Sequence, residues 1–213
     1  MIPARKVPKI SLTSKKISAA MRFALIIFIY LLTFIILDFR SHTFEIFPGI
    51  VAWYPPDGLS FAFLLTFGLG FLPVIAITSL ISSVFVYRLP LPFSELVGWA
   101  IIISIVYGIA AWFLRRRTRM DIRLHTTRDL LWLITSAAVV SMILAVVSIS
   151  ASVANGVILQ TEGFWATFQW WVGEMIGILV IAPVLLIHVM PNLKRFADGE
   201  APRRPLSFTH RSF

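Results

Sequence analysis

The sequence predicts an all-α protein, a polytopic helical membrane bundle of about six transmembrane helices with both termini cytoplasmic. Of its 213 residues, 58% are hydrophobic and 14% charged, whereas a soluble protein has roughly 25% charged residues. Several apolar runs reach the roughly 20 residues needed to cross a bilayer. The 19 Lys and Arg residues, against 10 Asp and Glu, lie mostly outside these runs, as in cytoplasmic loops of membrane proteins.

The apolar runs give the expected order of the elements. Five are visible, at about 19–38, 59–86, 96–114, 130–152 and 164–189. The first run follows a basic N-terminus (1–18), and no small-residue cleavage site of a signal peptide follows the run. We therefore expect it to be retained as a membrane span. The last is followed by a segment at 190–213 rich in Pro, Gly and Arg, expected to be a cytoplasmic tail or linker. Residues 19–189 then form one membrane domain.

The run at 59–86 decides the number of spans. Gly68, Gly70 and Pro73 interrupt it, which is typical of a turn. If the chain returns there to the side it left, 17 basic residues share one side and only Arg40 and Arg88 lie opposite. A single crossing would divide the basic residues much more evenly. The positive-inside rule therefore favours the return, and an even number of spans.

Two arrangements satisfy this charge count. In one, a second span runs from about 46 to 67, broken at 54–58, and a third from about 71 to 87. In the other, 59–86 forms a short re-entrant hairpin. A break at membrane depth is tolerated only where it is buried or lines a cavity, so a broken span indicates a site.

Glu174 is the most informative residue within the apolar runs. A carboxylate inside a span is costly and indicates function, although a solvated carboxylate near the membrane surface, beside belt tryptophans, is an alternative. Trp170 and Trp171 precede it, and a helix turns them about 100° apart, so one of them faces the bundle. Such an aromatic wall beside a carboxylate suits a cationic or amphipathic small molecule.

The segment 53–58 is the second candidate element. Two prolines stiffen it, and Asp57 is either part of a cavity mouth or the N-cap of the next helix. Arg40, His42 and Arg88 are candidate counter-ions on the same side. The ligand-binding residues predicted from both elements are Trp53, Tyr54, Pro56, Asp57, Trp170, Trp171 and Glu174.

Small residues predict where helices approach closely. Gly173 and Gly177 are four residues apart and flank Glu174, which would turn that carboxylate toward the bundle. We assign the same packing role to Gly58, Gly68 and Gly70.

Catalytic and metal chemistry find little support. The chain has no cysteine, and no His-Glu-x-x-His, Gly-x-Ser-x-Gly, P-loop or dinucleotide-binding motif. Its four histidines are expected on both sides of the membrane, so they cannot share a metal. We predict no enzyme activity, no cofactor and no metal. Because topology accounts for the net charge of +9, nucleic acid is not an expected partner.

Several motifs together resemble a known family, the bacterial membrane-associated sensor domain of the MASE-one type. They are Trp53-x-Pro55-Pro56-x-Gly58-Leu59, Leu64-Leu65-Thr66-Phe67-Gly68, Gly156-Val157, Trp170-Trp171-x-Gly173-Glu174-x-x-Gly177 and Pro183. The family commonly has Asp where this chain has Glu174. The resemblance implies an inner-membrane sensory module that acts on a histidine kinase or a cyclic-di-GMP enzyme. The chain ends soon after the last apolar run, so we expect that output in a partner or a further domain.

We therefore expect a ligand pocket between the 53–58 loop and the start of the sixth helix, with the signal leaving through that helix and Lys194-Arg195. Expected partners are the lipid bilayer, an unidentified small-molecule ligand, a cytoplasmic signalling domain or partner protein, and, as an option, a second copy in a homodimer. Two other functions stay open. The first is the substrate-binding membrane subunit of an energy-coupling-factor (vitamin) transporter, which the chain also resembles in its six expected spans and in the spacing of Ala20 and Ala24. The second is a membrane scaffold without a ligand.

Overall fold

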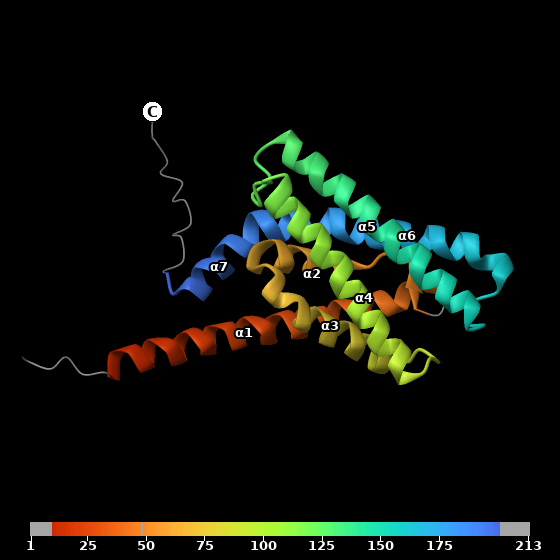
Figure 1. Ribbon diagram of the computed structural model, residues 1–213, viewed down its shortest axis with the longest axis horizontal. Coiled ribbons are helices and arrows are strands. Elements are labelled where there is room, and N and C mark those ends of the chain that lie inside the picture. Colours follow the sequence, from red (N-terminus) through yellow and green to blue (C-terminus); the bar gives the residue numbers. More distant parts are fainter. Residues whose placement is uncertain (1–9, 48, 201–213) are drawn as a thin grey trace, which may run out of the picture.

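The computed structural model describes residues 10–47 and 49–200, and nearly all of this chain is helical (Figure 1). The main helices are α1 (Ile10–Ser41), α2 (Pro55–Phe67), α3 (Leu72–Ile81), α4 (Phe93–Trp112), α5 (Thr127–Ala154), α6 (Gly163–Val184) and α7 (Met190–Asp198). The short elements are β1 (Glu45–Phe47), β2 (Ile50–Val51) and the single turns η1 (His42–Phe44), η2 (Leu69–Phe71), η3 (Ser82–Val86), η4 (Phe113–Arg117), η5 (Gln160–Glu162) and η6 (Leu185–Val189).

The predicted polytopic helical bundle is confirmed. Five stretches of the described residues are long and apolar enough to cross a bilayer: Ser18–Phe44, Leu69–Val86, Phe93–Arg117, Thr127–Ala154 and Gln160–Asp198. Helices α1 to α6 run alternately in opposite directions along the molecule (Figure 1). The turn of η2 joins α2 to α3, as the glycines at 68 and 70 predict.

Helix α2 differs from the other five because it is short and central. Its 13 residues cover only about 20 Å, against a hydrocarbon core of roughly 30 Å. All of them except Phe67 are buried, packed among α1, α4 and α6. The aromatic core around it includes Tyr30, Phe61 and Tyr107, none of which is exposed.

The expected second span at 46–67 is therefore only partly helical. Residues 45–51 form a small antiparallel hairpin of β1 and β2, and an extended segment leads from it to Pro55. The break thus lies before residue 55, not at 54–58. Non-helical backbone is tolerated at membrane depth where it is buried in protein, and part of this segment is buried and hydrogen-bonded. Ile50 and Val51 are 1% and 5% exposed, and the N–H of Ala52 donates to the carbonyl of Phe44 at 3.2 Å. Within the run at 59–86, Leu69–Val86 is by length and composition sufficient to cross a bilayer.

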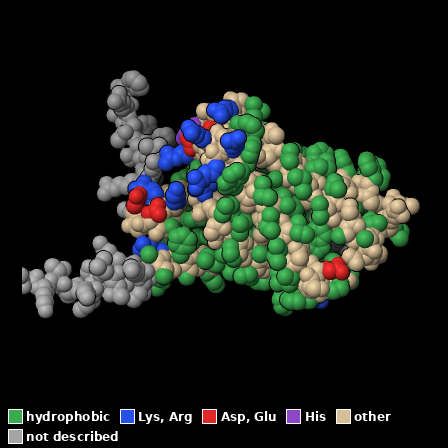
Figure 2. Space-filling view, in the orientation of Figure 1, with side chains coloured by type: hydrophobic (Ala, Val, Ile, Leu, Met, Phe, Trp, Pro, Cys, Tyr) green, Lys and Arg blue, Asp and Glu red, His purple; other side chains and the backbone are tan. Residues whose placement is uncertain are grey.

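Basic residues collect at one end of the molecule. Figure 2 shows Lys and Arg side chains gathered over α7 and the α4–α5 connection, while hydrophobic side chains cover most of the remaining face. Arg22 of α1 contacts this end directly, donating from Nε to the carbonyl of Ala197 at 3.3 Å. Residues 190–198 of the expected tail form helix α7. Thr126 is the N-cap of α5, and its hydroxyl accepts from the N–H of Asp129 at 3.2 Å.

Candidate functional site

The site is built on a strip of α6 that lacks side chains. A Cβ at Gly173 would overlap the carbonyl oxygen of Val51, and one at Gly177 would overlap that of Tyr54. The extended segment before α2 therefore lies directly against the backbone of α6. The N–H of Tyr54 donates to the carbonyl of Gly173 at 3.2 Å, which fixes the register between the two segments.

The start of α2 continues this close contact. Pro55 and Pro56 occupy its first turn, where a helix does not use their missing N–H groups. A Cβ at Gly58 would overlap the carbonyl oxygen of Gly177 and lie 2.6 Å from Cβ of Ile181. Asp57 is therefore held beside α6. It does not cap the helix, since the N-cap position belongs to Tyr54 and α2 begins at Pro55.

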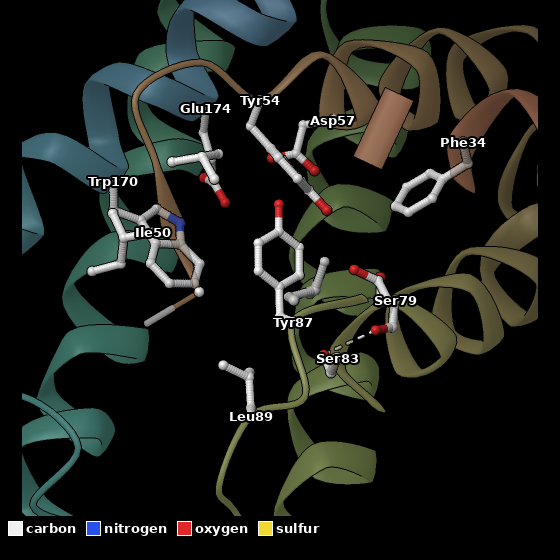
Figure 3. A pocket seen from close by; sticks show the side chains of 14 residues that line it. Phe34, Ile50, Tyr54, Asp57, Ser79, Ser83, Tyr87, Leu89, Trp170 and Glu174 are labelled. Atoms are coloured by element: carbon white, nitrogen blue, oxygen red, sulfur yellow. Dashed lines mark hydrogen bonds between the residues drawn. The ribbon is translucent and has the colours of Figure 1, made fainter. Parts of the chain in front are cut away.

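A cavity of about 80 Å³ lies between the segment that leads into α2, helix α6 and the end of the apolar stretch Leu69–Val86. Figure 3 shows Asp57, Glu174 and Tyr87 directing their oxygen atoms toward its centre, with Trp170 on one side and Phe34 on the other. At roughly 15 Å³ for each water, this volume holds on the order of five water molecules. The cavity therefore fits a small solute.

Three carboxyl groups are buried in and behind this cavity without a basic partner. Asp57 and Glu174 are 5% and 6% exposed, and Asp38 of α1 is not exposed at all. One oxygen atom of each accepts no hydrogen bond. In the described part of the chain, the ion pairs join only His42 to Glu45 and Arg195 to Glu200. Because ionising a buried carboxyl group without an opposite charge costs several kcal/mol, this grouping needs a functional explanation.

Hydrogen-bond donors surround the carboxyl groups. The Tyr54 hydroxyl donates to Oδ1 of Asp38 at 2.8 Å. The hydroxyls of Tyr87 and Tyr107 and Nε1 of Trp170 make no hydrogen bond within 3.5 Å among the described residues, but they interact with Asp38, Asp57 and Glu174, respectively. Burial, and next the charge of Asp38, raises the pKa of both Tyr54 and Tyr87 above the ordinary value of a phenol. Both hydroxyls therefore stay protonated at neutral pH, so Tyr54 can donate to Asp38 and Tyr87 has a hydrogen to donate into the cavity.

The structure brings together four of the seven residues predicted to bind a ligand. Tyr54, Asp57, Trp170 and Glu174 all line the cavity. Glu174 is not a solvated surface carboxylate, since α6 buries it.

The other three predicted ligand residues lie elsewhere. Pro56 is buried in the first turn of α2 but does not line the cavity, and Trp53 is 40% exposed. Trp171 is turned toward α5, where its Nε1 donates to the carbonyl of Ala138 at 3.0 Å. The expected aromatic wall is thus Trp170 and not Trp171, because adjacent helical residues point about 100° apart.

The predictions for Gly68, Gly70 and the suggested counter-ions have different outcomes. Gly68 ends α2 with a φ of +85°, and Arg115 lies beside it. A Cβ at Gly70 would meet no atom within 4 Å, so Gly70 marks no close helix contact, contrary to the sequence prediction. None of the suggested counter-ions lines the cavity, and His42 instead pairs with Glu45 at 2.7 Å.

Sequence reasoning missed Asp38, Tyr87 and Tyr107. Asp38 lies at the end of the first apolar run, and Tyr107 lies within another. The sequence signal that could have found Asp38 is that an ionisable residue at the edge of an apolar run often faces the bundle. The partner of Asp38, Tyr54, comes from a different segment, and no local pattern reveals that pairing.

The fold and the site define a multi-pass membrane protein with a polar cavity among its helices. A comparison with protein families finds that the MASE1 family model matches residues 22–206. The chain therefore belongs to the MASE1 family, and it is a membrane-integral sensory input domain of the inner membrane. This is a family of sensor domains and not of catalysts. Comparisons with curated proteins and with solved structures find no match.

Proposed function

We propose that the cavity beside Glu174 binds a small cationic solute and that its occupancy is the signal that this sensory domain passes to a cytoplasmic output. The observation that carries the proposal is the pair of buried carboxyl groups, Asp57 and Glu174, on one cavity whose described lining residues include no Lys or Arg. A bound cation would supply the missing opposite charge.

The walls support the choice of ligand class. Trp170, Tyr54 and Tyr87 line the cavity, and aromatic faces attract organic cations. The volume of about 80 Å³ is far below the roughly 300–1,000 Å³ of pockets for drug-sized ligands. It favours a solute of a few heavy atoms over the vitamin-sized molecule that an importer subunit would carry.

A route for the signal starts at the same residues. Glu174 belongs to a helical stretch, Gly163 to Asp198, that runs from the cavity through η6 to α7 without leaving helical conformation. Pro183 and the one-turn π-helix η6 interrupt its regular hydrogen bonding, and such points allow a helix to bend. A ligand that binds one bent form of the helix more tightly than another shifts the equilibrium between the two forms, and the size of the shift is set by its difference in affinity for them.

In this proposal residues 19–189 are the sensing unit, and α7 with Lys194 and Arg195 delivers the change to a histidine kinase or a cyclic-di-GMP enzyme. The basic N-terminus (1–18) and the segment 190–213 lie on the cytoplasmic side. A homodimer would bring two such outputs together.

The test uses ethylammonium and ethanol, which have the same number of heavy atoms and differ in charge. Saturation-transfer NMR on the purified protein in nanodiscs measures weak binding of such small solutes. We expect binding of ethylammonium and none of ethanol. Equal binding of both, or of neither, would overturn the cationic class. Absence of any bound solute would then favour the scaffold.

A further inference from the structure

A second cavity, of about 300 Å³, lies at the basic end of the molecule, between the end of α2 and the end of α4. It is separate from the proposed sensing site. The third span begins with Leu69 at this cavity and ends next to Tyr87 at the other one. The two cavities are thus at opposite ends of the same span.

One side of this cavity is apolar and the other is cationic. Leu64, Phe67 and Trp112 form the apolar wall, while Arg115 and Arg116 form the charged rim. Trp112 is 48% exposed, so the cavity opens toward the surroundings of the bundle.

Within the described part of the chain, Arg115 and Arg116 have no protein partner. No acidic residue is among the described residues that line the cavity, and neither guanidinium makes an ion pair or a hydrogen bond with any of them. Each keeps its full set of N–H donors for an anion. By contrast, Arg128 in the same basic region donates to the carbonyl of Thr118 at 3.3 Å.

Gly68 keeps the cavity open. Its φ of +85° is a conformation that side-chain-bearing residues rarely adopt, and a Cβ there would lie 2.8 Å from Nη1 of Arg115. Because Gly68 has no side chain, the guanidinium of Arg115 can lie against the backbone of Gly68 in the cavity.

We propose that this cavity binds one anionic lipid, with its phosphate on Arg115 and Arg116 and an acyl chain along Phe67 and Trp112. The charge complementarity selects an anion, and the apolar wall at the end of the membrane-spanning segment Phe93–Arg117 selects a lipid over a soluble phosphate. Basic pockets between transmembrane helices at this depth are suited to lipid headgroups. The site does not depend on the cationic ligand proposed above.

The experiment compares phosphatidylglycerol with phosphatidylcholine of identical acyl chains, titrated onto the delipidated protein in detergent and counted as bound lipid by native mass spectrometry. We expect the wild type to prefer phosphatidylglycerol at least about fivefold, the effect of roughly one basic residue at a membrane surface. Equal binding of the two lipids by the wild type overturns the proposal without any variant.

Two double variants with the same net charge locate the site. Arg115→Gln with Arg116→Gln is expected to remove the preference, whereas Arg117→Gln with Arg119→Gln, in the same basic segment but outside the cavity, is expected to keep it. Equal losses in the two double variants would show a diffuse electrostatic effect and overturn the site. Displacement of phosphatidylglycerol by millimolar inorganic phosphate would overturn the choice of a lipid.

Discussion

At the scale of single residues, Glu174 is the side chain on which ligand binding is expected to depend most. Glu174→Gln keeps the size of the side chain and removes its charge. We expect the bundle to remain folded and ethylammonium to bind at least tenfold more weakly, because truncating one partner of a buried charge pair costs about 2–5 kcal/mol. The measurement is the saturation-transfer titration in nanodiscs.

Glu162→Gln is the matched control for this prediction. Glu162 is exposed in η5, just before α6, so its loss should leave the affinity unchanged. Equal weakening by both substitutions would assign the effect to the net charge of this end of the protein and remove Glu174 from the mechanism.

Tyr54 ties the extended segment to α1 through its hydrogen bond to Asp38. Tyr54→Phe should lower the free energy of unfolding by about 1.5–3 kcal/mol, the usual range for a hydrogen bond to a charged group. Tyr87→Phe should cost less, since the Tyr87 hydroxyl makes no hydrogen bond within 3.5 Å among the described residues. Unfolding in a titration with SDS measures both, and a larger loss for Tyr87→Phe would contradict the account.

At the scale of elements, the contact between α2 and α6 depends on glycines. Gly177→Ala would bring a methyl group onto the carbonyl oxygen of Tyr54, and backbone cannot move aside as a side chain can. We expect the free energy of unfolding to fall by about 1–3 kcal/mol, as for other overpacked sites. Thermal unfolding in detergent, followed by circular dichroism, measures it.

Gly98→Ala is the control, because Gly98 also lies within a helix but a Cβ there meets no atom within 4 Å. It should leave stability unchanged or raise it slightly, since alanine favours helix. If Gly177→Ala were as harmless as Gly98→Ala, α6 and the extended segment would not be in the close contact described here.

The elements also show how far sequence reasoning reaches. Long apolar runs predicted α1, α4, α5 and α6 because hydrophobicity alone decides whether a segment crosses a bilayer. The hairpin at 45–51 could not be predicted, since its stability depends on burial against α6 and on the hydrogen bond from Tyr54 to Gly173. Both are contacts with residues more than 100 positions away.

The same distinction holds within the site. The rarity of a carboxylate in an apolar run was enough to find Glu174. Choosing between Trp170 and Trp171 needs the rotation of α6 about its own axis, which is set by packing on α5. Asp38 became recognisable only through Tyr54, its partner from another segment.

At the scale of the whole molecule, the basic end is expected to face the cytoplasm. The chain has no cysteine, so single cysteines report topology without background. His125, just before α5, and Thr161, in η5 after it, are both exposed. A membrane-impermeant maleimide added to intact cells should label Thr161→Cys and leave His125→Cys unmodified until the cells are opened. The reverse labelling pattern would show that the protein is inserted in the opposite orientation and would contradict this prediction.

The central claim is that the cavity formed by Tyr54, Asp57, Trp170 and Glu174 is a binding site. Native mass spectrometry of protein released from gentle detergent tests it most directly, because it detects a co-purified solute of any identity by its mass. The account predicts a small cationic species on the wild type and on Glu162→Gln, and its loss from Glu174→Gln. A species that stays bound to Glu174→Gln, or a wild type that carries none, would contradict it.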